Sequence, residues 1–561
     1  MVEDLPPGDD EEPKDKPDGP TAALDSAHVG DIKGAFGTIR EHDLAARRSW
    51  WKKFLTLLAI AGPGLIVMVG DNDAGGVSTY AQAGQNFGLS LLWTLPLLIP
   101  VLIVNQEMVV RLGAVTGVGH ARLIKERFGT FWGAFSVGDL FVLNFLTIVT
   151  EFIGVGLALA YFGISTYISV PIAALGLIAI TASGSFRRWE RFMFIFIVVN
   201  FLAIPLVILV HPRAGPVLHG FFVPGAQGGM SSTAVLLIIA IVGTTVAPWQ
   251  LFFQQSNIVD KRITPRWINY ERADTILGSL VVVIAATAIL VTAAFAFRGT
   301  GLAGHFTNAA GVARGLEHIV GHGTGPLFAL VLLNASIIGA AAVTLSTSYA
   351  FGDMFGIRHS LHRNFADAKQ FYFLFSALVV CAAGIVLIPR APLGLITTAV
   401  QALAGVLLPS ATVFLLLLCN DKEVLGPWVN RPWLNALSGL VIAVLVALSL
   451  ILMATTVFPD LEVTSLALVL GAIIVAGFLG VGSWALLPGQ RAKRRLAIQL
   501  AAVAERETTV RRVTWRMPQL ALLERPVWSR GRTMAMWVLS LYLAVAVLLL
   551  VVKAVQLGIT H

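Results

Sequence analysis

The stretch GPGLIVMVGDNDAGGV, residues 62–77, places two aspartates and the three glycines Gly70, Gly75 and Gly76 in the middle of a long run of apolar residues. Glycine favours non-helical backbone, and a charged side chain at membrane depth costs at least ~2.5 kcal/mol. Asp71 and Asp73 therefore need a compensating cation or a water-filled cavity. The stretch predicts a membrane helix that is broken between Asp71 and Gly76 and that faces a cavity or a ligand.

A second interruption lies in TTVAPWQLFFQQ, residues 244–255. Pro248 has no backbone N–H and clashes with the preceding turn, so the carbonyls of Thr244 and Ala247 are expected to lose their helical partners. In lipid, such backbone is tolerated only where it is buried in protein or lines a cavity. Pro248 alone would favour a simple kink. However, the two interruptions fall in the first and sixth spans, which indicates a five-plus-five inverted repeat with a site at mid-membrane.

The rest of the chain has the composition of a membrane protein. Of its 561 residues, 56% are hydrophobic and 13% are charged, whereas soluble domains carry about 25% charged residues. The apolar runs lie near residues 54–84, 89–117, 131–162, 165–183, 189–210, 232–257, 272–298, 326–352, 369–389, 395–419, 434–457, 464–487 and 533–556. Runs of this length can cross a hydrocarbon core of about 30 Å. The predicted fold class is an all-α polytopic membrane protein with two or three spans beyond a ten-span core.

The charge pattern predicts an orientation in the membrane. Basic residues gather in alternate connections, at 122–127, 187–191, 261–272 and 358–369, and the formal net charge is +8. The positive-inside rule places these connections and the N-terminus in the cytoplasm, and a bacterial cytoplasmic (plasma) membrane is the expected location. In this setting the basic residues orient the chain, so no nucleic-acid partner is expected. The two cysteines form no disulfide framework.

Five regions follow from this pattern. Residues 1–50 are predicted to be a disordered cytoplasmic tail, residues 51–425 the transporter core, and residues 426–487 additional spans. Residues 488–532 form a basic cytoplasmic segment that is expected to lie on anionic lipid headgroups, with a regulatory binding segment as the alternative. Residues 533–561 hold a C-terminal span and a short tail. The oligomeric state is left open.

The two breaks offer only oxygen donors. Carboxylate, amide and carbonyl oxygens suit hard cations such as Mg²⁺, Mn²⁺ or Ca²⁺. Neither break contains a thioether or an imidazole. The interruptions therefore predict a site for a divalent cation.

Several motifs in this sequence are similar to those of the NRAMP family of divalent-metal transporters, over about residues 50–430. The matching motifs are Gly62-Pro63-Gly64 followed by Gln82-Ala83-Gly84, Gln106 with residues 111–117 (RLGAVTG), Glu151-Phe152-Ile153-Gly154, and Gln401 eight residues before Pro409. The resemblance implies a LeuT-like fold, which agrees with the positions of the two breaks.

The departures from the family pattern concern its ligands. The family's Asp-Pro-Gly-Asn is Asp73-Ala74-Gly75-Gly76 here, and its Met-Pro-His is Ala247-Pro248-Trp249. The resemblance implies that the soft thioether and one amide ligand are lost, as in the NRAMP-related magnesium transporters. Gln254 and Ile148 replace two family residues that serve proton movement, whereas Glu151 remains.

The expected substrate is Mg²⁺, with Mn²⁺ also admitted, as a partly hydrated ion. Asp73 and Asp71 are expected to supply charge, the Thr244 and Ala247 carbonyls to complete the shell, Gly76 to leave room for water, and Gln401 to close the site. The membrane potential contributes ~4.6 kcal/mol per divalent ion at 100 mV, so transport without proton coupling is expected.

Three alternatives stay open at this point. They are a proton-coupled Mn²⁺/Fe²⁺ importer, an organic-solute symporter on the same fold, and a membrane sensor that transports nothing. An enzyme is not expected, and no cofactor is predicted.

Overall fold

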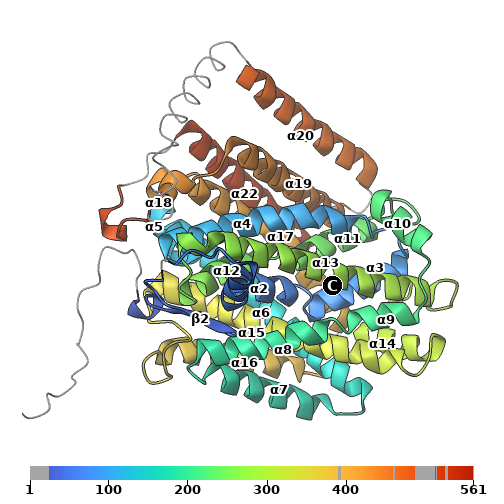
Figure 1. Cartoon of the computed structure of the whole chain (residues 1–561). Coiled ribbons are helices and arrows are strands. Elements are labelled where there is room, and N and C mark those ends of the chain that lie inside the picture. Colours follow the sequence, from blue (N-terminus) through green and yellow to red (C-terminus); the bar gives the residue numbers. More distant parts are fainter. Residues whose placement is uncertain are drawn as a thin grey trace, which may run out of the picture.

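A computed structural model describes residues 25–43, 45–389, 393–458, 461–486, 512, 515–524 and 529–559. Long helices dominate it (Figure 1), which confirms the all-α membrane class. Ten helices of the described residues are long and apolar enough to cross a membrane, or eleven if the bent pair α1–α2 is one span. The prediction for residues 488–532 falls largely outside the described residues.

The helices of the first half carry both predicted breaks. They are α1 (Trp50–Ile60), α2 (Pro63–Gly70), α3 (Ala74–Phe87), α4 (Thr94–Thr116), α5 (His120–Phe128), α6 (Thr130–Tyr161), α7 (Thr166–Thr181), α8 (Phe186–Asn200), α9 (Ala203–Leu209), α10 (Ala214–Phe222), α11 (Ser232–Thr245) and α12 (Pro248–Asp260). Helix α2 ends at Gly70 and α3 begins at Ala74, whereas α11 ends at Thr245 and α12 begins at Pro248. Both breaks are therefore confirmed.

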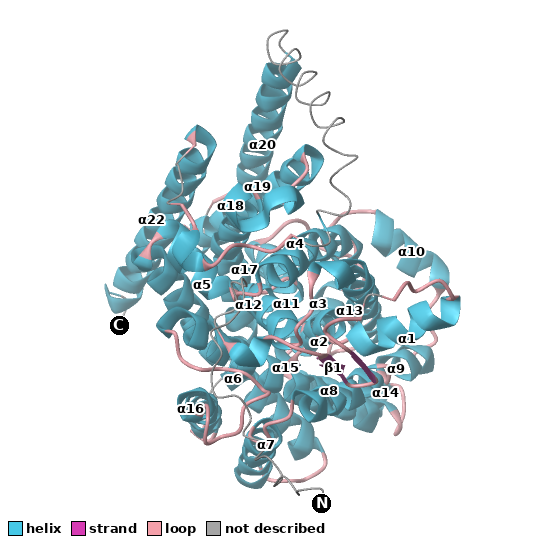
Figure 2. Cartoon of the chain, turned by 60° about the vertical axis from the view of Figure 1, so that its left-hand side comes forward, coloured by secondary structure: helices cyan, strands magenta, loops and turns pink. Residues whose placement is uncertain are grey.

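The second half completes the bundle and adds helices on one side. These helices are α13 (Ile268–Phe297), α14 (Ala309–Ile319), α15 (Thr324–Phe355), α16 (Lys369–Val386), α17 (Leu393–Cys419), α18 (Lys422–Leu425), α19 (Pro432–Val457), α20 (Val463–Leu486) and α22 (Arg530–Ile559). Figures 1 and 2 show α19, α20 and α22 along one side of the bundle, outside the helices that carry the breaks.

The first span contains an additional bend. Helices α1 and α2 meet at 55°, where Gly62 adopts φ 151° and Pro63 begins α2. The Asp274 carboxylate of α13 accepts the N–H groups of Gly62, Gly64 and Leu65 at 3.0, 2.8 and 3.1 Å. A carboxylate is favourable at the N-terminus of a helix, where the backbone N–H groups lack partners. The bend therefore fixes the direction in which α2 approaches the Asp71 break.

The prediction of a disordered tail over residues 1–50 is wrong for residues 25–43. A short 3-10 helix (Ser26–His28) precedes an antiparallel hairpin of β1 (Ile32–Gly34) and β2 (Gly37–Ile39). The hairpin contacts α1 and α8, as Figure 2 illustrates. The segment itself is too polar to form a core, and some of the partners that order it, in α8 and at Arg363, lie far away in the sequence.

One of these partners is the Arg363 side chain, which hydrogen-bonds to the Asp25 carboxylate. Burial raises the pKa of Asp25, but hydrogen bonds from Arg363 and from the Ala27 N–H outweigh it and hold the pKa below its ordinary value. The ionised carboxylate therefore stabilises the docked segment.

Candidate metal site

Asp73 connects the two breaks. It is 1% exposed and is the N-cap of α3, where its Oδ1 accepts the N–H of Gly76 at 2.6 Å. The same oxygen accepts the Thr244 hydroxyl, from the end of α11, at 3.4 Å. The structure therefore brings a carboxylate of the first break against the sixth span, as the sequence predicted.

The carbonyls of Thr244 and Ala247 differ in whether they keep a backbone hydrogen-bond donor. Pro248 has no N–H, so the Thr244 carbonyl lacks the donor that a continuous helix would supply. Ala247, the N-cap of α12, keeps a partner, because its carbonyl accepts the Gln250 N–H at 3.2 Å. The expectation that Ala247 loses its partner is therefore wrong: α12 begins at once and supplies a new donor. Thr244 is the residue whose carbonyl is left available.

Asp71 is held by a glutamine that sequence reasoning missed. The Gln250 side-chain nitrogen donates to Asp71 Oδ1 and also to the Thr245 carbonyl at 3.1 Å. Gln106 of α4 donates in turn to Gln250 Oε1 at 2.9 Å. Asp71 Oδ2 is buried and has no hydrogen-bond partner among the described residues. The signal that could have identified Gln250 is its amide side chain, which lies in an apolar run two residues after Pro248.

Gln401 of α17 lies against the first turn of α3. A Cβ atom placed on Gly75 would lie 1.6 Å from Gln401 Nε2, so only glycine lets this amide approach so closely. Gln401 Nε2 is buried without a hydrogen-bond partner in the described part of the chain. The structure thus brings Gln401 to the site, as predicted.

Gly76 has a different role from the expected one. A Cβ atom there would lie 2.8 Å from the Asp71 carbonyl oxygen and 3.0 Å from Thr244 Oγ1. The missing side chain therefore permits a close approach of the two breaks and does not leave a void for water. The Gly76 N–H contributes by fixing the Asp73 carboxylate.

Glu151 of α6 forms an acidic cluster with Asp71 and Asp73. Its Oε2 accepts the Ala74 N–H at 3.0 Å. The side chain lies beside Asp73, because a Cβ atom built on Gly339 would lie 2.6 Å from Glu151 Oε2 and 2.8 Å from Asp73 Cβ. Its Oε1 has no partner among the residues that the structure describes. The sequence indicated Glu151 only as a residue that is kept from the family pattern, because nothing in its helix indicates that it reaches α3.

The cluster is not a metal cage of charged ligands. Among the described residues no group of three or more histidine, cysteine, aspartate or glutamate side chains is arranged to hold a metal ion. A cation between the breaks would need carbonyl, hydroxyl, amide or water oxygens beside the carboxylates. Such mixed oxygen shells are typical of Mg²⁺, Ca²⁺ and Mn²⁺.

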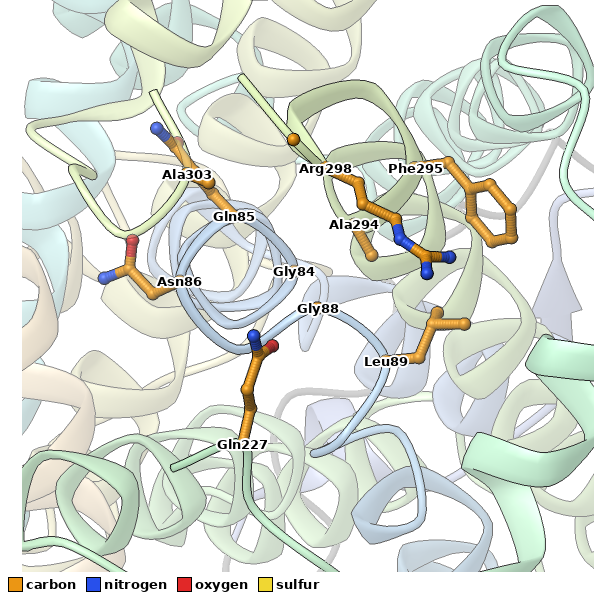
Figure 3. Close-up of a pocket in the computed structure, with 11 residues that line it drawn as sticks. Gly84, Gln85, Asn86, Gly88, Leu89, Gln227, Ala294, Phe295, Arg298 and Ala303 are labelled. Atoms are coloured by element: carbon orange, nitrogen blue, oxygen red, sulfur yellow. The ribbon is translucent and has the colours of Figure 1, made fainter. Parts of the chain in front are cut away.

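A cavity of about 390 Å³ lies at the far end of α3 (Figure 3). Its lining includes Gln85, Asn86, Gln227 and Arg298. Gln85 follows Asp73 by twelve residues, or about 18 Å along a helix. The cavity is therefore separate from the acidic cluster, and the Arg298 charge makes it a poor site for a cation.

The close packing of Gly75 against Gln401 predicts the effect of a Gly75→Ala variant. The new methyl group must displace the flexible Gln401 side chain, so we expect the fold to persist while the KM for the metal rises roughly 10- to 100-fold, as when a supporting ligand is lost. Uptake kinetics in proteoliposomes would measure this. Gly138→Ala, where a Cβ meets nothing within 4 Å, is the control, and equal KM values for both variants would contradict the role of Gln401.

A helical bundle whose two interrupted spans meet around buried carboxylates defines a polytopic transporter of the LeuT-like class. The model of the natural resistance-associated macrophage protein-like (Nramp) family matches residues 64–455, which is more than half of the chain. The chain therefore belongs to the Nramp family.

Individual relatives agree with this assignment. The chain is 26% identical over 417 residues to the divalent metal cation transporter MntH of Bacillus subtilis, covering 72% of this chain and 93% of that protein. It is 29% identical over 411 residues to MntH of Ralstonia nicotianae, covering 70% and 90%. These relatives are metal transporters and not enzymes.

A solved structure supports the fold. The manganese transporter of Eremococcus coleocola, in complex with an aromatic bis-isothiourea substituted compound, matches with a TM-score of 0.60 and 21% identity, over 79% of this chain and 96% of that one. This likeness establishes the fold, with its five-plus-five repeat, but not the substrate or the mechanism.

Proposed function

We propose that this protein carries a divalent metal cation across the membrane through a site between the α2–α3 and α11–α12 breaks. The observation that carries the proposal is the Asp73 carboxylate, which caps α3 and contacts Thr244 of the opposite break. A cation there would neutralise buried acidic groups that are costly in a membrane. The Asp71 Oδ2 and Glu151 Oε1 oxygens lack partners among the described residues, so they are available as further oxygen donors.

Mn²⁺ is the first candidate substrate. The relatives of this chain are named as divalent metal or manganese transporters, and these names favour Mn²⁺ over the Mg²⁺ preference expected from the sequence. An oxygen-only donor set is also compatible with Mn²⁺.

Mg²⁺ is the second candidate, and one observation favours it. Ala247 stands in the break where the family pattern has a methionine, and no thioether of the break residues 71–76 or 244–249 replaces it. Mg²⁺ dehydrates reluctantly and keeps several waters, so it suits a site with few protein ligands.

Flux of Mn²⁺, Mg²⁺ and Cd²⁺ into proteoliposomes distinguishes these candidates. A site for hard cations transports Mn²⁺ or Mg²⁺ and is inhibited weakly by Cd²⁺. Strong preference for Cd²⁺ would contradict an oxygen-only site. The absence of any metal flux from folded protein would refute the proposed function and favour a sensor, and flux of an organic solute would favour a symporter.

An Ala247→Met variant tests the missing soft ligand directly. Ala247 is 3% exposed at the start of α12, so a thioether there would lie inside the break. We expect Cd²⁺ to inhibit Mn²⁺ uptake about tenfold more strongly in this variant, because thioethers select softer metals. Ala247→Leu controls for side-chain volume, and an equal gain in both variants would contradict the prediction.

We further propose that metal movement is driven by the membrane potential without protons. Gln254 Nε2 donates to Thr275 Oγ1 at 2.9 Å, and Ile148 is buried and apolar, so neither position can carry a proton. The proton-coupled importer remains the alternative, because Glu151 lies beside Asp73. A pH-sensitive dye inside the vesicles measures coupling, and acidification in strict proportion to metal entry would establish the alternative.

The proposed location is the bacterial cytoplasmic membrane with the N-terminus inside. Basic connections support this orientation through the positive-inside rule. Labelling of single cysteines placed at exposed positions, such as Lys52 in α1, from each side of the membrane tests it.

A further inference from the structure

A second cavity, of about 340 Å³, lies beside α4, away from the metal site. Helix α4 lines it with Glu107, α13 with Arg272, and the connection into α19 with Trp428 and Arg431. The preceding residue, Gln106, points to Gln250 and the acidic cluster instead. Consecutive helical residues face directions about 100° apart, so the cavity and the metal site occupy different faces of α4.

The cavity is strongly cationic. Among the described residues, its lining holds four arginines, Arg111, Arg272, Arg431 and Arg512, and one carboxylate, Glu107. That carboxylate is shared, because it accepts Arg111 Nε at 3.0 Å and Arg272 Nε at 3.1 Å. Arginines therefore outnumber carboxylates among the lining residues that the structure describes.

Arg431 is the lining cation most available to a ligand. It is exposed and serves as the N-cap of α19. Its guanidinium makes no hydrogen bond or ion pair with any described residue. An anion entering the cavity would meet a donor that has no competing protein partner.

Trp428 holds the other guanidinium groups in place. Arg272 and Arg512 lie 5.9 and 5.5 Å from the centre of its ring, within the range of cation–π attraction. The Trp428 carbonyl accepts Arg111 Nη1 at 2.6 Å, and its indole N–H donates to the Arg512 carbonyl at 3.0 Å. The arginines are therefore preorganised around the cavity, which lowers the entropic cost of binding an anion.

Apolar surface continues from the cavity. Trp433, which also lines it, is 60% exposed. Exposed apolar side chains follow at helical spacing on the flanking helices, namely Ile276, Leu277, Leu280 and Ile284 on α13 and Leu440 and Val444 on α19. A soluble anion would use only the arginines, whereas a lipid would use the arginines for its phosphate and this surface for its acyl chains.

We propose that this cavity binds the headgroup of an anionic phospholipid, with its phosphate between Arg272, Arg431 and Arg512. Basic pockets between membrane helices on the cytoplasmic side are suited to such headgroups. The positive-inside rule assigns the basic connection at 261–272, which includes Arg272, to the cytoplasm. The site is independent of which metal the protein carries.

Native mass spectrometry of the full chain, mixed with equal amounts of phosphatidylglycerol and phosphatidylcholine, tests the proposal. Wild-type protein is expected to retain phosphatidylglycerol preferentially. Arg431→Gln and Arg272→Gln are each expected to lower that retention about fivefold and to leave phosphatidylcholine retention unchanged. Arg298→Gln, in the cavity at the other end of α13, is the matched control with unchanged retention.

Three results would overturn the lipid assignment. They are equal retention of the two lipids by wild-type protein, unchanged phosphatidylglycerol retention in Arg431→Gln, and displacement of phosphatidylglycerol by millimolar inorganic phosphate, which would identify a soluble anion as the occupant. Arg272→Gln breaks an ion pair with Glu107 and can perturb folding. Arg431→Gln changes an exposed side chain that pairs with none of the described side chains, so it decides the question by itself.

Discussion

Replacing Asp73 by asparagine is expected to lower metal flux at least about a hundredfold while the protein stays folded. A buried carboxylate and a nearby cation interact by several kcal/mol even at an effective dielectric constant of 20, and the neutral amide loses this attraction. Asparagine is also a good N-cap, so it keeps the hydrogen bond to the Gly76 N–H. The variant therefore removes charge and preserves local structure.

Proteoliposome flux and thermal unfolding together test this prediction. Thermal stability should be unchanged or higher, because an amide costs less to bury than a charge. Asp367→Asn, an exposed acid before α16, should transport like wild type. Asp73→Ala should lose both flux and about 1 kcal/mol from the lost cap. Flux of Asp73→Asn within twofold of wild type would falsify the site.

Replacing Lys261 by methionine is expected to destabilise the protein by about 3–5 kcal/mol. Lys261 is fully buried, and its ammonium group donates to Glu190 at 2.6 Å and to the carbonyls of Ile60 and Ala61 at 2.6 and 2.8 Å. These carbonyls end α1, where a cation is favourable. Methionine would leave the Glu190 carboxylate buried without its cation.

The double variant Lys261→Met/Glu190→Gln should recover part of this loss, because the uncompensated charge is gone. Lys52→Met, at an exposed position of α1, should be nearly neutral. Unfolding in detergent, followed by circular dichroism, measures all three. Single and double variants of equal stability would show that the ion pair is not the source of the effect.

Much of the site was predictable because charged and helix-breaking residues are costly inside a bilayer. An aspartate or a proline inside an apolar run has few tolerable explanations, so Asp73 and Pro248 located both breaks. The Gly62-Pro63 bend was missed, although proline at the first position of a helix is a recognised start signal.

Long-range partners were not predictable. Gln250 is 179 residues from Asp71, and Glu151 is 77 residues from Ala74. Neither pair can be recognised from the local sequence pattern, because each residue is also compatible with the periodicity of its own helix. The hairpin of residues 32–39 was missed for the same reason: Glu190 accepts the N–H of Ala35 from a distant helix.

The sequence by itself determined that the chain is an α-helical membrane protein with oxygen-lined breaks in its first and sixth spans, since each of these properties follows from the cost of polar groups in lipid. Only the tertiary structure decided which oxygens meet. It showed that Ala247 keeps a backbone donor, that Gly76 permits contact where a void was expected, and that Glu151 joins Asp73. These outcomes depend on how helices pack, and packing is set by side chains that are far apart in the sequence.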